Sequence, residues 1–154
     1  MTMEYSEKRG DVGLVFSIMI GKVSMAINRK LYRDFKSAGL EFTPEQWTVL
    51  YCLWGKDGVT QQELCNKTFK DKPSMTRLID NLEKQNYVVR IADATDRRTN
   101  IIHLTRLGKN SRDLANEVVL KAMNEAFDGV SGTDYELARR VLDIVFENLK
   151  VSLV

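Results

Sequence analysis

The sequence predicts a mainly α-helical fold that carries one small β-hairpin (α+β). Apolar residues recur at three- and four-residue steps along most of the chain, capping signals precede several of these runs, and two β-rich segments follow the fourth run. The 154 residues are 44% hydrophobic and include only two prolines, so the chain can bury a core and shows no flexible linker. We therefore expect one domain, residues 1–154.

The first predicted helix, residues 11–39, has one long apolar face. Its members are Val12, Phe16, Met19, Val23, Ile27 and Leu31. Such a face needs a partner, which could be the C-terminal helices or a second copy of the chain. Because Lys22, Arg29 and Lys30 interrupt the run and the residues before it are polar, we expect neither a signal peptide nor a membrane span.

The second predicted helix begins with a capping box. Thr43 can accept from backbone N–H groups of the first turn, Pro44 suits that turn, and Gln46 can complete the box. The glycine at position 55 marks the end of the helix. Its apolar stripe consists of Trp47, Leu50, Tyr51 and Trp54.

Two shorter helices follow and form a candidate helix-turn-helix. A short extended link ends at Thr60, which opens a second capping box with Glu63, and this helix runs to Thr68. Asp71 can cap the next helix, which has a basic start. The apolar face of that helix is Met75, Leu78, Ile79 and Leu82. Two helices joined by a tight polar turn are typical of the helix-turn-helix motif.

A β-hairpin comes directly after this motif. Residues 87–91 and 100–104 have the composition of strands, and the loop 92–99 between them is polar. This order predicts a winged helix-turn-helix module over residues 42–104.

The C-terminal segment, residues 105–154, is predicted to be helical. Thr105 can cap a long helix that carries Leu107, Ser111, Leu114, Val118 and Ala122. A third capping box, Thr133 to Glu136, opens a helix that carries Ala138, Val141, Leu142, Val145 and Leu149. We assign dimerisation to residues 11–39 and 105–154, which bracket the module.

The fourth helix is the candidate reader of DNA bases. At about 100° per residue, its outward face carries Pro73, Arg77, Asp80 and Lys84, flanked by Ser74, Thr76 and Asn81. Arg77 can make a bidentate contact to guanine, and Lys67, Lys70 and Lys72 can meet phosphates beside the positive end of the helix dipole. Asp71 partly offsets this positive charge.

The predicted hairpin has a basic tip. Arg97 and Arg98 are adjacent there and could enter the minor groove, where the potential is most negative over A·T-rich sequence. Asp96 could hold an arginine in a fixed geometry, and Arg90 is a further partner for such a pair. A basic helix start or a charged hairpin tip is by itself usually solvated surface. The two in this order favour DNA binding, because both must approach one duplex.

Three stretches of the sequence resemble the MarR family of bacterial winged-helix regulators. Residues 93–98, Asp-Ala-Thr-Asp-Arg-Arg, look like the family's DxxDRR wing signature. Residues 104–108, Leu-Thr-Arg-Leu-Gly, are similar to the LTxxG that follows it, and residues 42–50 resemble LTxxQxxVL. The three blocks occur in the family's order and the resemblance covers nearly the whole chain.

The resemblance implies a ligand-responsive repressor that binds a pseudo-palindromic operator as a homodimer. In it, the first helix and the last two interlock and present two modules to successive major grooves. The residues expected at double-stranded DNA are Lys72, Pro73, Ser74, Thr76, Arg77, Asp96, Arg97 and Arg98. Arg98 is expected in the minor groove with Asp96 ordering the wing, and Arg97 at phosphate. Pro73 either packs on a thymine methyl group or only initiates its helix.

Family members commonly bind small, often phenolic, effectors between the dimerisation helices and the module. Trp47, Tyr51, Trp54, Met19 and Met25 could line such a pocket, although stripes of this kind usually form core. Redox sensing through Cys52 or Cys65 is an alternative, but the two form no CxxC motif and no adjacent base supports an activated thiolate at Cys65.

An enzyme is not expected. The single histidine, His103, lies in a predicted strand, and neither a metal-ligand spacing nor a glycine-rich phosphate loop occurs, so we expect no cofactor and no metal. The alternative from another class is a winged helix that binds a protein partner. The unpaired cysteines fit a cytoplasmic protein.

Overall fold

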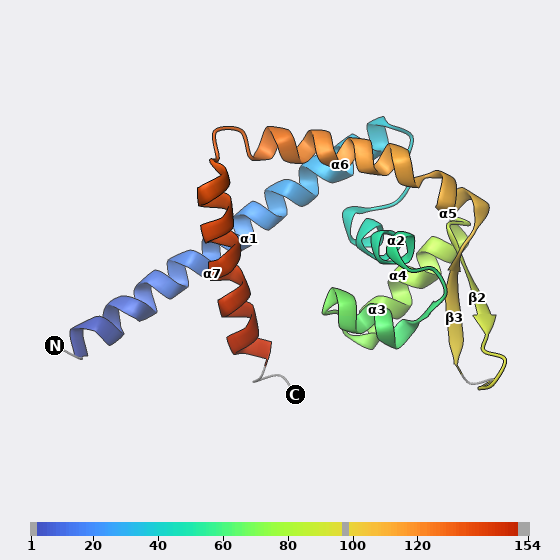
Figure 1. Ribbon diagram of the computed structural model, residues 1–154, viewed down its shortest axis with the longest axis horizontal. Helices are drawn as coiled ribbons and strands as arrows, with labels where there is room; N and C mark the ends of the chain where they lie inside the picture. Colours follow the sequence, from blue (N-terminus) through green and yellow to red (C-terminus); the bar gives the residue numbers. More distant parts are fainter. Residues whose placement is uncertain (1–2, 97–98, 151–154) are drawn as a thin grey trace. The chain divides into compact units, whose positions relative to one another are not determined.

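The computed structural model of the chain describes residues 3–96 and 99–150. Their helices are α1 (Met3–Ser37), α2 (Pro44–Gly55), α3 (Gln61–Thr68), α4 (Lys72–Lys84), α5 (Arg106–Asn110), α6 (Arg112–Ala126) and α7 (Gly132–Lys150), and their strands are β1 (Val59–Thr60), β2 (Val88–Ala92) and β3 (Asn100–Leu104) (Figure 1). The chain divides into two compact units, Met1–Ala122 and Met123–Val154. The predicted mainly helical fold with a hairpin is confirmed.

The core of the first unit lies among α2, α3, α4 and the strands. Its fully buried side chains are Phe35, Phe42, Val49, Leu50, Leu53, Val59, Leu64, Met75, Ile79, Leu82, Val88 and Ile102. The ring of Phe42 meets the rings of Phe35 and Tyr87 edge to face, with centroids 5.0 and 5.2 Å apart. Segments distant in sequence therefore share one close-packed cluster.

The hairpin belongs to a three-stranded antiparallel sheet of order β1-β3-β2. Val88 on β2 lies opposite Leu104 on β3, and Val59 on β1 lies opposite Ile102. The link before α3, which the sequence indicates only as extended, is thus the third strand. Its two residues join the helix-turn-helix to the hairpin through backbone hydrogen bonds.

The predicted starts of α2, α3 and α4 are confirmed. Thr43 and Thr60 each form a complete capping box, and Asp71 accepts from the backbone N–H of Ser74 at 2.7 Å. The predicted apolar face of α4 is fully buried or nearly so. The stripe predicted for α2 is partly wrong, because Tyr51 is 59% exposed and the core-facing residues of α2 include Val49 and Leu53.

The long helix predicted after Thr105 is two helices, α5 and α6. Thr105 caps α5 as expected, but α5 ends at Asn110 and Ser111 separates it from α6. The carbonyl oxygen of Gly108 accepts from the hydroxyl of Ser111 at 3.0 Å and from the indole N–H of Trp54 at 2.8 Å. These side-chain donors occupy the acceptor that the next helical turn would have used.

Gly108 is also a point of close approach between α5 and the start of the hairpin. A Cβ built at Gly108 would lie 2.1 Å from the carbonyl oxygen of Tyr87, which is backbone and cannot move aside. The oxygen of Tyr87 accepts in turn from the backbone N–H of Thr105 at 3.0 Å. The glycine of the Leu-Thr-Arg-Leu-Gly stretch therefore permits this contact.

The second unit contains the end of α6 and α7. Its helix α7 is capped by Ser131, whose hydroxyl accepts from the backbone N–H of Asp134 at 3.1 Å and donates to its carboxylate at 2.6 Å. The predicted box at Thr133 and Glu136 is therefore placed two residues too late. The rings of Phe127 and Tyr135 meet edge to face across the turn, 5.7 Å apart.

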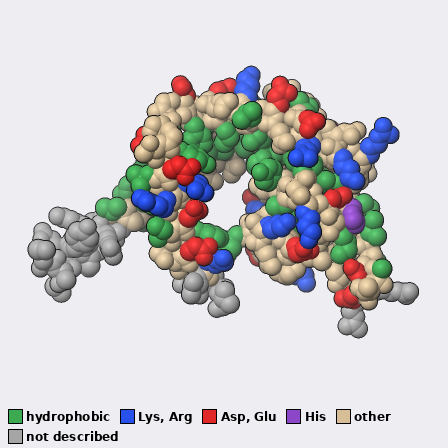
Figure 2. Space-filling view, in the orientation of Figure 1, with side chains coloured by type: hydrophobic (Ala, Val, Ile, Leu, Met, Phe, Trp, Pro, Cys, Tyr) green, Lys and Arg blue, Asp and Glu red, His purple; other side chains and the backbone are tan. Residues whose placement is uncertain are grey.

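Apolar side chains of three helices are uncovered in the single chain. They include Val12, Met19, Val23 and Met25 on α1, Leu114 and Leu120 on α6, and Leu137, Leu142, Ile144 and Leu149 on α7. Figure 2 shows hydrophobic side chains open at the surface. Leu31, near the end of α1, is buried.

By length and composition alone, the segment Val12–Ser37 of α1 is apolar enough to cross a membrane: its most apolar 18-residue window has a mean hydropathy of 1.3, and no residue of that window is buried, whereas Leu31 and Phe35 of the segment are. We expected Lys22, Arg29 and Lys30 to rule out a membrane span, but the segment meets the criterion of length and composition despite them. Core helices of soluble proteins and N-terminal signal sequences meet the same criterion.

Candidate nucleic-acid interface

The first two turns of α4 gather five of the residues predicted at DNA. Lys72, Pro73 and Arg77 are exposed, and Ser74 and Thr76 are partly buried. The aligned peptide dipoles of α4 give this end a partial positive charge that adds to the charge of the lysine and the arginine.

The cap of α4 contributes the opposing negative charge. The Asp71 carboxylate accepts from the backbone N–H of Ser74, and this hydrogen bond is the main reason that the pKa of Asp71 is lowered. The charge of Arg77 lowers the pKa further, so the carboxylate stays ionised beside this arginine. The chain as a whole is nearly balanced in charge, with a formal net charge of +2, and the pairing of acidic Asp71 with the basic start of α4 is one local example.

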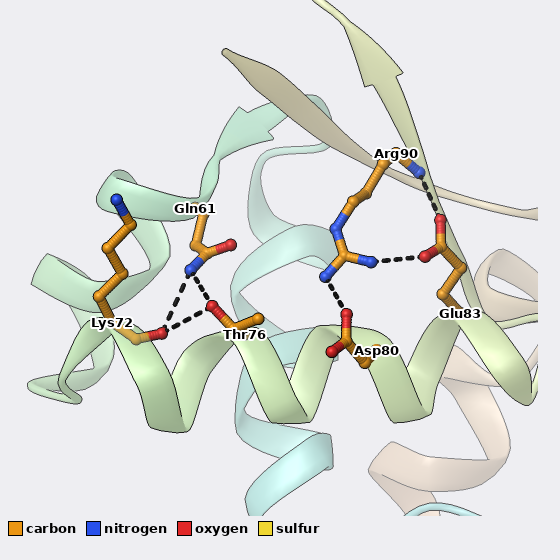
Figure 3. A network of polar contacts seen from close by, with 6 residues as sticks. All are labelled: Gln61, Lys72, Thr76, Asp80, Glu83 and Arg90. Carbon is orange, nitrogen blue, oxygen red and sulfur yellow. Dashed lines mark hydrogen bonds and ion pairs between the residues drawn. The ribbon is translucent and has the colours of Figure 1, made fainter. Parts of the chain in front are cut away.

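One stripe of α4 is occupied by contacts within the chain. Figure 3 shows that Lys72, Thr76, Asp80 and Glu83, which follow one another at three- and four-residue steps, face Gln61 and Arg90. Gln61 is the first residue of α3 and Arg90 lies on β2. Helix α4 is therefore bonded on this side to both neighbouring elements.

Arg90 joins the hairpin to α4. Its guanidinium lies 2.5 Å from Asp80 and 2.5 Å from Glu83, and its backbone N–H donates to Glu83 at 3.1 Å. Arg90, which the sequence indicates as a partner for Asp96, thus pairs with two carboxylates of α4 and offsets one of their two charges. Asp80 is half-buried and engaged, so its placement on the freely outward face is only partly correct.

The adjacent stripe is the one left open to solvent. Pro73, Arg77, Asn81 and Lys84 are all exposed. Beside it lies a cavity of about 270 Å³ between the start of α2 and α4, lined by Thr43, Glu45, Gln46, Lys70, Ser74, Arg77, Leu78 and Asn81. Lys70 forms a 3.5 Å ion pair with Glu45 at its edge, which holds the lysine against α2.

The loop of the hairpin is ordered by two aspartates. Asp93 accepts from the backbone N–H groups of Thr95 and Asp96 and from the Thr95 hydroxyl, and these hydrogen bonds lower the pKa of Asp93. Asp96 accepts from the hydroxyl of Thr99 at 3.0 Å. Arg97 and Arg98, predicted for the grooves and phosphates, lie outside the described residues.

Sequence reasoning missed the roles of Gln61 and Glu83. Both are polar residues on helices whose partners lie on other elements, 15 residues away for the Gln61–Thr76 hydrogen bond and seven for Glu83–Arg90. The signal in the sequence was the capping box, which fixes Gln61 at the first turn of α3. No periodicity indicates which neighbour such a side chain meets.

The aromatic residues considered for an effector pocket have different surroundings. The rings of Trp47 and Tyr51 lie 5.4 Å apart, and the buried indole N–H of Trp47 has no hydrogen-bond partner within residues 3–96 and 99–150. Trp54 is engaged with Gly108. Met19 and Met25 are more than half exposed on α1.

The thiols and the histidine have ordinary structural surroundings. Cys65 is buried and Cys52 half-buried, and burial raises the pKa of both thiols. His103 lies 3.8 Å from the carboxylate of Asp57, which also accepts from the backbone N–H of Leu104. In the described part of the chain, no group of three His, Cys, Asp or Glu side chains is arranged to hold a metal ion.

Similar sequences are transcriptional regulators. A model of the MarR family matches residues 39–99. The chain is 30% identical over 102 residues to the HTH-type transcriptional regulator SarZ of Staphylococcus aureus (strain USA300), which is 66% of this chain and 68% of that protein. It is 31% identical over 97 residues to SarZ of Staphylococcus epidermidis. That match covers 62% of this chain and 64%, just under two thirds, of the relative's length.

Solved structures share the fold. The transcriptional regulator SlyA superposes with a TM-score of 0.81 at 22% identity, covering 89% of this chain and 95% of that chain. Reduced AbfR bound to DNA superposes with a TM-score of 0.77 at 22% identity, covering 99% of this chain and all of that one (100%). The match of the family model and the 30% identity over about two thirds of SarZ establish that the chain belongs to the MarR family.

Proposed function

We propose that the chain is a sequence-specific, double-stranded DNA-binding transcriptional regulator. The observation that carries this proposal is the exposed start of α4, bearing Lys72, Pro73 and Arg77, with a hairpin bonded directly to the same helix by Arg90. An α-helix fits the major groove, and a hairpin beside it can reach the adjacent minor groove. The regulators named SarZ and the AbfR structure bound to DNA support this reading.

Each part of this surface has a separate role in the proposal. Arg77 reads a guanine, while Ser74, Thr76 and Pro73 make the neighbouring base or backbone contacts. Lys72 meets phosphate at the helix start. In the wing, Arg98 enters the minor groove, Arg97 meets phosphate and Asp96 orders the loop.

The active form in this proposal is a homodimer in the cytoplasm. The apolar residues uncovered on α1 and α7 form the surfaces that a second copy would cover. A two-fold dimer presents two copies of α4, so its operator would be pseudo-palindromic. Sedimentation at micromolar concentration should show a dimer, and a monomer would contradict this part of the proposal.

We further propose that the regulator is a repressor and that a small aromatic effector acts on it. The support is the neighbouring pair Trp47 and Tyr51, whose ring planes are tilted by 42°, together with the buried indole N–H of Trp47, which lacks a partner among the described residues and which a carboxylate or phenol oxygen would satisfy. A panel of phenolic acids, followed by tryptophan fluorescence and by release of bound DNA, tests this. Binding that is lost in Trp47→Phe, which removes only the N–H and part of the ring, would support the site.

The experiment that decides DNA binding is selection from random duplexes, followed by affinity measurements at several salt concentrations. We expect an enriched palindromic motif and a log affinity that falls linearly with log salt. Arg98→Ala should weaken binding. A chain that selects no motif and associates with a protein in a salt-insensitive way would be a protein-interaction module instead.

A further inference from the structure

The side chain of Gln61 reaches from the first turn of α3 to the recognition helix. Its amide nitrogen donates to the hydroxyl oxygen of Thr76 at 2.7 Å and to the carbonyl oxygen of Lys72 at 3.2 Å. The hydroxyl of Thr76 donates in turn to the same carbonyl oxygen at 2.9 Å. Three residues from two helices thus form one closed set of hydrogen bonds (Figure 3).

These hydrogen bonds use the donor proton of the Thr76 hydroxyl and one of its acceptor positions. A threonine hydroxyl has one proton to donate, and here that proton goes to the Lys72 carbonyl oxygen. One of its acceptor positions receives the Gln61 amide. In Figure 3 the hydroxyl of Thr76 points toward Gln61 and Lys72, and its methyl group points away from them.

We propose that Gln61 is a positioning residue that holds Thr76 in the rotamer whose methyl group, and not its hydroxyl proton, is offered to the major groove. The inference rests on the proposed function, because it assigns part of the base preference of α4. In the major groove the apolar partner for a methyl group is the 5-methyl group of thymine. The dimer would therefore prefer thymine over a base without that methyl group at one position of each half-site.

A free threonine would be less selective. Its hydroxyl could rotate and either donate or accept, so that it could serve several bases or a phosphate. Removal of the donor leaves a mostly apolar contact, which a polar base edge cannot satisfy. The selectivity therefore depends on the amide of Gln61 as well as on Thr76.

The test uses the full-length protein and the duplex obtained by selection. Each thymine of a half-site is replaced in turn by deoxyuridine, which removes only the 5-methyl group. We expect one position at which the wild-type affinity falls about fourfold, the effect of one lost methyl contact. Thr76→Val, which keeps a methyl group in place, should retain this discrimination, and Thr76→Ser should abolish it.

Gln61 is tested in the same assay. Gln61→Met has nearly the same length without the donors and should reduce the thymine preference, because the Thr76 rotamer is then held by the single hydrogen bond to the Lys72 carbonyl oxygen and its hydroxyl regains an open acceptor position. The matched control is Gln62→Met, since the side chain of Gln62 donates to Asn66 on its own helix and not to α4 among the described residues. Thermal melts of each variant show whether α3 and α4 remain folded.

The outcomes separate this inference from the proposed function. A wild-type protein that selects no duplex motif overturns the proposed function. A protein that selects a motif but whose Thr76→Ser variant keeps the full deoxyuridine effect overturns only the assignment of Thr76. Full thymine preference in a folded Gln61→Met variant overturns the positioning role of Gln61.

Discussion

Arg90 contacts Glu83 twice, donating from its backbone N–H to one carboxylate oxygen and from its guanidinium to the other. A strand is thereby held to a helix by both its main chain and its side chain. The guanidinium also bonds Asp80, one turn earlier on α4. The pairing fixes where the hairpin lies relative to the recognition helix.

The first prediction concerns Arg90. Arg90→Gln should weaken DNA binding about tenfold, or about 1.4 kcal/mol, because two carboxylates become uncompensated beside the phosphates and β2 loses its anchor. Affinity at several salt concentrations measures this effect. The matched control is Arg139→Gln on α7, which also breaks an ion pair, Arg139–Glu136 at 3.1 Å.

A rescue variant divides the effect into its parts. Adding Asp80→Asn and Glu83→Gln to Arg90→Gln removes the repulsion and should recover part of the lost affinity, most of all at low salt. The share that is not recovered measures the anchoring of β2. Wild-type affinity in Arg90→Gln alone would show that the pairing has no part in DNA binding.

The second prediction concerns Gly108. Gly108→Ala should destabilise the fold by about 3 kcal/mol, because the new methyl group would overlap the Tyr87 carbonyl oxygen and force α5 away from the hairpin. Denaturant unfolding measures the loss. Gly55→Ala is the control, since nothing lies within 4 Å of a Cβ built there, and the two variants should differ widely.

The sequence predicted those features that depend on local spacing. The buried face of α4 follows from its 3.6-residue period, and the caps at Thr43, Thr60 and Asp71 need only residues within one turn. Features that depend on a distant partner were missed. The break at Ser111 arises where Trp54 donates to Gly108, and a two-residue β1 is too short to have a period.

The candidate site shows the same division. Helical geometry predicted that Arg77 is exposed near the start of α4. It could not predict that Asp80 is bonded by Arg90 or that Thr76 is bonded by Gln61, because each contact joins two elements whose packing is set by the whole core. The roles of Arg97 and Arg98 stay predictions.

The third prediction concerns the thiols. Burial is the main cause that raises the pKa of Cys65, with the charge of Asp71 second, and burial likewise raises the pKa of Cys52. At pH 7.5 both should therefore react with iodoacetamide more slowly than in the urea-unfolded chain, because less thiolate is present. Mass spectrometry measures both rates. A thiol that reacts faster in the folded protein would support redox sensing.

The fourth prediction concerns the cap of α4. Because its folded pKa is lowered, the ionised Asp71 stabilises the fold at pH values above the unfolded pKa of about 3.9, and this contribution is lost as the pH falls through the folded pKa. Asn can cap without titrating. The melting temperature of Asp71→Asn should therefore fall less than that of the wild type between pH 5 and about pH 2.

The substitution Asp71→Asn should also strengthen DNA binding, whereas the loss of a basic residue would weaken it. Asp71→Asn keeps the cap and removes one negative charge from the start of α4, so affinity should rise for all duplexes alike. Asp71→Ala lacks the cap and should melt earlier at pH 7. An affinity gain confined to the selected motif would contradict this purely electrostatic role.

The last prediction separates base reading from phosphate binding on one helix. Arg77→Ala should relax the base preference at one position of each half-site, whereas Lys72→Ala should weaken all sequences about equally and reduce the salt slope by about one. Arg77→Lys keeps the charge without the planar fork and should also lose the preference, although it binds non-specific DNA as well as wild type. Repeating the selection with each variant measures this. If the motif selected by Arg77→Ala is unchanged, another residue of the exposed stripe reads that base.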